Sequence, residues 1–143
     1  MIKVEALHHV SLPVTNLERS RAFYRDILGL REIERPPFDF AGAWFAVGTG
    51  QLHLIVHDQP TLRTRGIDSR DGHFAVRVRN YRETVAVLYS HGYRPDAPDE
   101  TKRLRENPAG QAGFPQVFLL DPDRHVIELN ALPPDETGHE SPI

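Results

Sequence analysis

The chain has 143 residues, 39% hydrophobic and 26% charged, with a formal net charge of −3, which is typical of one soluble globular domain without a basic surplus for nucleic acid or anionic membranes. Because it contains no cysteine, disulfides, thiolate metal sites and a cysteine nucleophile are excluded, and any metal must be held by histidines and carboxylates. No apolar run approaches the roughly 18 residues that span a bilayer, and the N-terminus lacks the apolar core of a signal peptide, so we expect a cytoplasmic protein.

The first half of the chain predicts a strand, a helix and three further strands. HHVSLPV (8–14) alternates polar and apolar residues, which is typical of a half-buried strand with His9 on its polar face. Asn16 can cap a helix through LERSRAFYRDIL (17–28), and Gly29 can end it. Three strand-like runs follow, separated by proline and glycine: LREIE (30–34), GAWFAVG (42–48) and QLHLIVH (51–57).

The second half repeats this order at a fixed offset, since His73 and Asn80 each follow their counterparts His9 and Asn16 by 64 residues (73 − 9 and 80 − 16). A helix begins at Asn80, with Glu83 three residues on as in a capping box, and strands are predicted over 93–95, 116–121 and 125–131. The segment 96–113 is predicted to be a long loop.

We therefore predict an α+β fold of two βαβββ modules, at about residues 5–58 and 70–132 of a single domain spanning 1–132. The modules would form a curved mixed sheet around a concave metal site, and residues 133–143 would be a flexible tail.

Four polar residues are expected on the sheet faces turned away from the helices: His9, His53, His73 and Glu128. An unpaired carboxylate within VIEL (126–129) would be costly to bury, and a metal ion would relieve that cost. Three imidazoles and a carboxylate suit iron, nickel, zinc, manganese or cobalt. The other histidines are assigned elsewhere: His8 to the helix side, His125 to a turn outside the site, and His57, His91 and His139 to exposed positions.

A substrate pocket is predicted around this metal. Arg35, Phe40 and Trp44 would line it together with Phe38, and Gln116 could point its amide inward. Lys102, Arg103 and Arg105 form a basic cluster on the long loop, which could close over an anionic substrate such as a carboxylate or phosphate.

The sequence resembles the vicinal oxygen chelate superfamily in three motifs: HHVSLPVTNLERSRAFYRDILGL near the start, GHFAVRV at the head of the second module, and DPDRHVIEL near the end. That superfamily includes glyoxalase I, type I extradiol dioxygenases, fosfomycin-modifying enzymes and bleomycin-resistance proteins. The resemblance implies a divalent metal held by His9, His73 and Glu128, with His53 at the fourth module position. It also implies a homodimer, in which the site would lie either within one chain or across two chains that exchange modules.

One departure from the family pattern leaves the reaction open: His53 stands where glyoxalase I proteins usually have a glutamate. A second departure, DPDRH (121–125) in place of the usual DPDGN, is expected to change the turn. The leading hypothesis is a metal-dependent lyase or isomerase that binds vicinal oxygens of a small molecule, with Glu128 or His53 as the base. One alternative is an Fe(II) ring-cleaving dioxygenase, because two histidines and a carboxylate form a facial triad; another is a non-catalytic protein that binds a drug or metabolite.

Overall fold

The computed structural model describes residues 1–57 and 63–133, and the chain divides into two compact units, Met1–Leu62 and Arg63–Ile143. Each unit contains one four-stranded mixed sheet, and neither sheet is closed into a barrel. The order of strand, main helix and three strands occurs in both units, so the predicted α+β fold with two βαβββ repeats is confirmed. Apart from Pro133, the predicted flexible tail lies outside the described residues.

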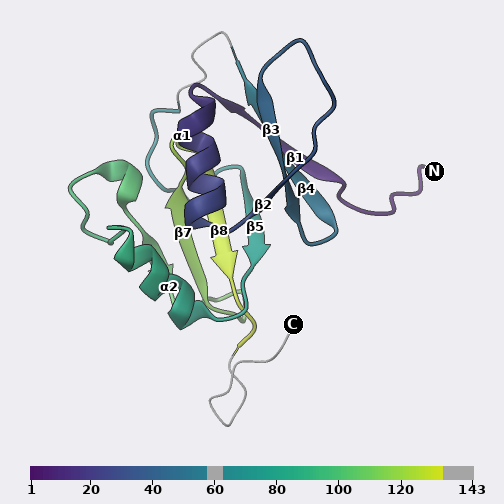
Figure 1. Ribbon diagram of the computed structural model, residues 1–143. Coiled ribbons are helices and arrows are strands. Elements are labelled where there is room, and N and C mark those ends of the chain that lie inside the picture. Colours follow the sequence, from purple (N-terminus) through teal and green to yellow (C-terminus); the bar gives the residue numbers. More distant parts are fainter. Residues whose placement is uncertain (58–62, 134–143) are drawn as a thin grey trace. The chain divides into compact units, whose positions relative to one another are not determined.

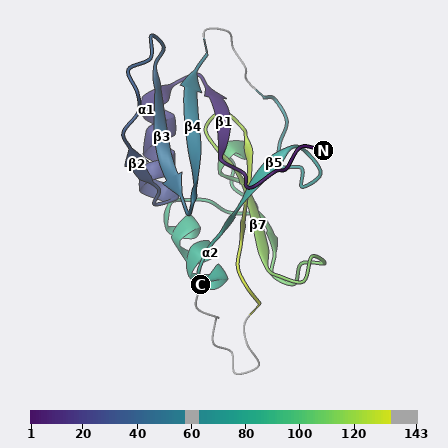
Figure 2. The ribbon, with the colours of Figure 1, turned by 90° about the vertical axis from the view of Figure 1, so that its right-hand side faces the viewer.

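The first unit is built on a sheet with the strand order β1-β4-β3-β2 (Figures 1 and 2). Its strands are β1 (His9–Val14), β2 (Arg31–Ile33), β3 (Gly42–Val47) and β4 (Gly50–Val56). β1 is parallel to β4, and the other two pairs are antiparallel. Because side chains alternate along a strand, this register places His9, Trp44 and His53 on one face of the sheet.

The two main helices begin at the asparagines predicted to cap them. They are α1 (Leu17–Ala22), which continues as a π-helical turn η1 (Phe23–Ile27), and α2 (Tyr81–Ser90). The side-chain oxygens of Asn16 and Asn80 each accept a hydrogen bond from the backbone N–H three residues on, at 3.0 and 2.8 Å. Gly29 and Gly92 follow the helices with φ of +68° and +83°, the left-handed conformation that commonly ends a helix. No described helix is long and apolar enough to cross a bilayer.

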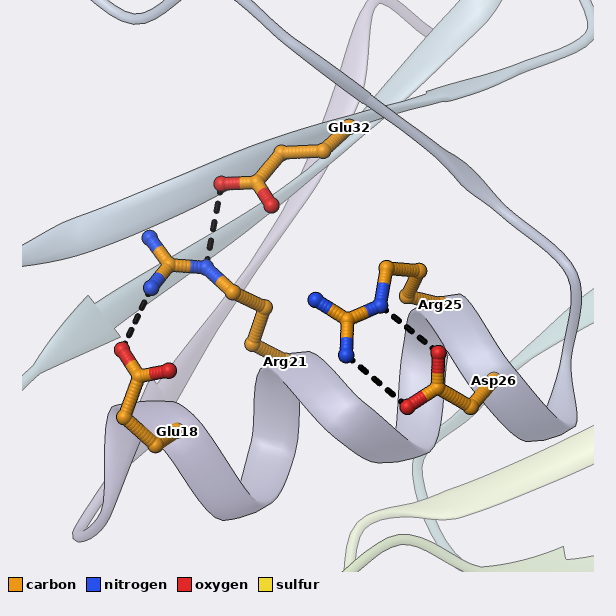
Figure 3. Close-up of polar contacts among 5 residues, drawn as sticks. All are labelled: Glu18, Arg21, Arg25, Asp26 and Glu32. Carbon is orange, nitrogen blue, oxygen red and sulfur yellow. Dashed lines mark hydrogen bonds and ion pairs between the residues drawn. The ribbon is translucent and has the colours of Figure 1, made fainter.

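Aromatic burial holds α1 and η1 against the face of their sheet opposite His53 (Figure 2). Phe23 and Tyr24 are almost fully buried, and the Tyr24 ring lies 6.1 Å from that of Phe45 on β3, measured between centroids. Figure 3 shows the ion pairs on the outer side of this segment, which join Arg21 to Glu18 and Glu32 and Arg25 to Asp26. Exposed pairs of this kind contribute little because water and salt screen them, so the buried rings are the main attachment.

The second unit has the strand order β5-β8-β7-β6, and Figure 1 shows β8 between β5 and β7. Its remaining elements are β5 (His73–Arg77), η2 (Glu100–Lys102), β6 (Arg105–Asn107), β7 (Gln116–Leu120) and β8 (Val126–Asn130). β5 is parallel to β8, and the other pairs are antiparallel. The register sets Arg105, Phe118 and Glu128 side by side in one row across β6, β7 and β8.

One strand prediction is wrong. Residues 93–95 form only an isolated bridge, from Arg94 to Arg103, because Pro95 has no N–H for a continuing ladder. The edge strand β6 comes instead from residues predicted as loop. Its Glu106 points away from the Glu128 face and accepts a hydrogen bond from the Tyr89 hydroxyl on α2 (2.6 Å).

The turn between β7 and β8 holds Arg124 in the left-handed conformation, with φ of +66°. A non-glycine residue in this conformation costs roughly 1–2 kcal/mol. The Asp121 side chain fixes the turn, because its Oδ1 accepts hydrogen bonds from the backbone N–H groups of Asp123 (2.9 Å) and His125 (2.8 Å). Arg124 therefore occupies a backbone position that suits glycine.

Candidate metal centre

The first unit brings His9 and His53 together on one face of its sheet. On β4, His53 lies opposite Trp44 of β3, and their rings stack with centroids 4.1 Å apart and planes inclined by 6°. His9, on the other neighbouring strand, stacks on the same ring at 4.3 Å and 13°. His53 is thereby enclosed between two rings and is only 7% exposed.

The surroundings of His53 favour the neutral imidazole. Its Nε2 donates a hydrogen bond to Oε1 of Gln51 (2.7 Å), which leaves Nδ1 with the lone pair. Burial lowers the pKa of His53 below its ordinary value of 6.5, and the nearby charges of His9, His8 and Arg35 lower this pKa further. The unprotonated Nδ1 can therefore accept a proton at neutral pH.

The prediction that His8 lies on the helix side is wrong. His8 is exposed, and its Nδ1 is hydrogen-bonded to Nδ1 of His9 (2.8 Å). β1 begins only at His9, so the alternation of strand side chains does not extend to residue 8. This bond engages Nδ1 of His9 and leaves Nε2 as the ring nitrogen available to a ligand.

The second unit brings His73 and Glu128 together. Nδ1 of His73 donates to the backbone carbonyl of Asp71 (2.8 Å), and Nε2 faces Oε2 of Glu128 at 3.4 Å. The other carboxylate oxygen, Oε1, accepts hydrogen bonds from Nε2 of Gln116 (3.0 Å) and Nδ2 of Asn130 (2.7 Å). Glu128 is 5% exposed, and Oε2 is the oxygen left for a further partner.

His73 and Glu128 are suited to supply two of the ligands of a metal ion. In the neutral ring, the Nε2 lone pair of His73 and Oε2 of Glu128 are both electron-rich, so a cation beside them is stabilised. The carbonyl that holds His73 and the amides that hold Glu128 are the kinds of outer partner that orient metal ligands. Within residues 1–57 and 63–133, no three histidine or carboxylate side chains are grouped for metal binding. Each unit thus supplies two of the four predicted ligands.

A cavity of about 660 Å³ opens beside His73 and Glu128 in the second unit. Its other lining residues are Ser69, Arg105, Glu106, Asn107, Gln111, Ala112, Gln116 and Phe118. The predicted pocket residue Gln116 is among them, and Nδ2 of Asn107 donates a hydrogen bond to its Oε1 (3.3 Å). Gln116 therefore both lines the cavity and holds the carboxylate.

The predicted aromatic wall is assembled in the first unit. Arg35 lies over the rings of Phe38 and Phe40, with its guanidinium carbon 4.7 and 4.8 Å from their centroids, and it donates to the Phe40 carbonyl (2.8 Å). Phe38 in turn contacts Trp44, with centroids 6.0 Å apart. A continuous set of aromatic rings therefore leads to His53 and His9.

Lys102 and Arg103, predicted as substrate-binding residues, do not line the cavity beside Glu128. Nζ of Lys102 donates to the carbonyl of His91 (3.0 Å) and lies over the Tyr93 ring. Nε of Arg103 donates to the carbonyl of Ala97 (2.9 Å). Lys102 thus joins the loop to the end of α2, Arg103 bonds within the loop, and Arg105 is the member of the basic cluster that reaches the cavity.

The sequence reasoning missed Asn130 and placed Asn107 in a loop. Asn130 could have been found, because it follows Glu128 by two residues on the same strand and so shares its face. The remaining histidines agree with expectation where the structure describes them: His57 and His91 are exposed and His125 is buried in the turn, whereas His139 lies outside the described residues.

Comparison with known proteins gives a consistent result. The chain is 29% identical over 132 residues to "Glyoxylase I 4" of Arabidopsis thaliana, covering 90% of this chain and 71% of the relative. It is 28% identical over 131 residues to a lactoylglutathione lyase of Salmonella typhimurium, covering 86% and 90%.

The fold matches those of several crystal structures. A glyoxalase family protein from Bacillus anthracis superposes with a TM-score of 0.74 at 21% identity, covering 93% of this chain and 99% of that one. A mutant of the fosfomycin resistance protein FosX from Listeria monocytogenes, in complex with Mn(II) and 1S,2S-dihydroxypropylphosphonic acid, gives 0.69 at 20% identity and covers 92% and 95%. The profile of the Glyoxalase/Bleomycin resistance protein/Dioxygenase superfamily matches residues 6–129, and the chain belongs to this superfamily.

Proposed function

We propose that this protein is a divalent-metal-dependent enzyme of the lyase or isomerase type, acting on a small molecule that carries vicinal oxygens. The observation that carries the proposal is the arrangement of His73 and Glu128. Each has one polar atom committed to an outer partner and the other turned toward its neighbour at 3.4 Å. The two related glyoxalase-type proteins support the lyase class.

His9, His73 and Glu128 would hold the metal, which would be iron, nickel, zinc, manganese or cobalt. The metal would polarise two neighbouring substrate oxygens and stabilise negative charge that develops on them. We place His53 beside the metal, not on it. An imidazole lone pair lies in the plane of its ring, so two rings stacked nearly parallel at 4.3 Å do not direct their lone pairs at one ion.

His53 is then the candidate base. Its buried, neutral ring presents Nδ1, because Nε2 is held by Gln51, and it can take a proton from a carbon next to a polarised oxygen. Oε1 of Glu128 accepts hydrogen bonds from Gln116 and Asn130. These bonds would keep the carboxylate in one orientation when His53 takes the proton. Arg35, Phe40 and Trp44 would exclude water from the side of the substrate that faces His53.

Metal analysis of purified variants tests this proposal. We expect near-stoichiometric metal in the native protein, and loss of both metal and turnover in His73→Ala and Glu128→Ala. His91→Ala is the matched control, because His91 is exposed at the end of α2 and should keep its metal. Full metal content in both site variants would refute the proposal.

The identity of the metal distinguishes the lyase or isomerase hypothesis from the dioxygenase hypothesis. Two histidines and a carboxylate also form the facial triad of Fe(II) oxygenases, so stoichiometric iron together with oxygen consumption on catechols would favour a ring-cleaving dioxygenase. A protein that binds metal and ligand saturably without forming product would be a binding or resistance protein.

A further inference from the structure

Arg105 shares a face and a row with Glu128. Strand β6 pairs Arg105 with Phe118 of β7, and Phe118 is paired in turn with Glu128 of β8. Neighbouring strands lie about 4.8 Å apart, so the Cα atoms of Arg105 and Glu128 are roughly 10 Å apart across the sheet. Both side chains line the same cavity.

The positively charged side chain of Arg105 is also available to bind a ligand. Arg105 is exposed, and in the described part of the chain its guanidinium has no hydrogen-bond or ion-pair partner. Its neighbours in the basic cluster differ, because Lys102 and Arg103 donate to the carbonyls of His91 and Ala97. Arg105 is the one lysine or arginine among the described residues that line the cavity.

An apolar floor separates this cation from the candidate metal ligands. Phe118 stands between Arg105 and Glu128 in the row, is 4% exposed, and sets its ring edge to face with His73 at 5.7 Å between centroids. In the adjacent row, Asn107, Gln116 and Asn130 are hydrogen-bonded in the chain that ends at Oε1 of Glu128. The amides are thus committed to the carboxylate, and the guanidinium remains for the ligand.

We propose that Arg105 binds an oxyanion group at the far end of the substrate, so that the substrate class is a short-chain acid with vicinal oxygens at one end and a carboxylate or phosphonate at the other. This inference rests on the proposed function, which supplies the chelating end. The guanidinium grips either oxyanion through two parallel hydrogen bonds. The carbon chain between the ends lies over Phe118.

Paired hydroxamate probes test the inference, because a hydroxamate chelates divalent metals through two neighbouring oxygens. Succinic, glutaric and adipic monohydroxamates are compared with the same compounds carrying a terminal amide, and with phosphonate-ended analogues. Affinities are measured by calorimetry on the metal-loaded protein and on the metal-free protein.

We expect the best carboxylate or phosphonate probe to bind on the order of 10- to 100-fold more tightly than its amide counterpart, and the better of the two identifies the oxyanion. Arg105→Gln should abolish this preference while leaving the affinity for the amide probe unchanged. Arg82→Gln removes one positive charge from the exposed side of α2 and should retain the preference.

Two failures are distinguishable. If no charged probe is preferred, or if Arg105→Gln keeps the full preference, the role of Arg105 is overturned, even where the amide probe still requires metal. If the amide probe binds equally with and without metal, the proposed metal function is overturned, and the inference that rests on it falls as well.

Discussion

The hydrogen bond from Asn130 to Glu128 gives the sharpest test of how the candidate site is organised. Asn130 is 6% exposed, and its Nδ2 lies 2.7 Å from Oε1 of Glu128, closer than the Gln116 donor at 3.0 Å. Asn130→Leu keeps the side-chain volume nearly constant and removes one of the two donors. The carboxylate could then rotate, and Oε2 would no longer be held toward His73.

The expected magnitude follows from that geometry. A hydrogen bond to a charged group contributes about 1.5–3 kcal/mol, and loss of an outer partner of a metal ligand commonly weakens metal binding about 10- to 100-fold. We therefore expect Asn130→Leu to raise the metal dissociation constant by about that factor, measured in competition with a chromophoric chelator.

Thr84→Val is the matched control for this measurement. It removes a hydrogen bond of the same length, from Thr84 Oγ1 to the Asn80 carbonyl (2.7 Å), in the same unit but on α2. Its metal affinity should equal that of the native protein. If Asn130→Leu binds metal as tightly as the control does, the assignment of Asn130 as an orienting partner is refuted.

Three further predictions concern stability. Arg124→Gly should raise the free energy of unfolding by roughly 0.5–1 kcal/mol in urea titrations. Glycine adopts the left-handed conformation without strain, and this gain exceeds the loss of the partly exposed ion pair between Arg124 and Glu100. A less stable variant would contradict this. The Arg63 guanidinium holds the pKa of Asp71 below its ordinary value of 3.8. Arg63→Gln should therefore be less stable than the native protein at neutral pH, and this difference in unfolding free energy should vanish as the pH falls through the lowered pKa of Asp71. An unchanged difference between the two proteins at low pH would exclude this linkage. Leu54→Ala, at a fully buried position, should cost about 2–5 kcal/mol in the same titrations, and a cost below this range would mean that the core collapses around the cavity.

Local signals in the sequence were sufficient for most of the architecture. The asparagine caps and the 64-residue offset predicted the two repeats. Alternation of polar and apolar residues along β4 and β8 placed His53 and Glu128 on the sheet faces turned away from the helices. Strand β6 could not be predicted, because Arg105–Asn107 contains no apolar residue and forms a strand only through its pairing with β7.

Side-chain partners were less accessible to sequence reasoning than strand faces. The basic cluster of Lys102, Arg103 and Arg105 was predicted as a unit, but only Arg105 lines the cavity. The face on which a residue lies is unknown until its strand and register are known. The stacking of His53 between Trp44 and His9 likewise depends on three strands meeting in register.

The stack on His53 also turns the chain's single tryptophan into an optical reporter. Indole emission is sensitive to a charged imidazole in face-to-face contact, and Trp44 lies 4.1 Å from the ring of His53. Protonation of this histidine, or a ligand that displaces its ring, would change the intrinsic fluorescence without any label. Events at the His53 half of the candidate site can therefore be followed by fluorescence of the native protein.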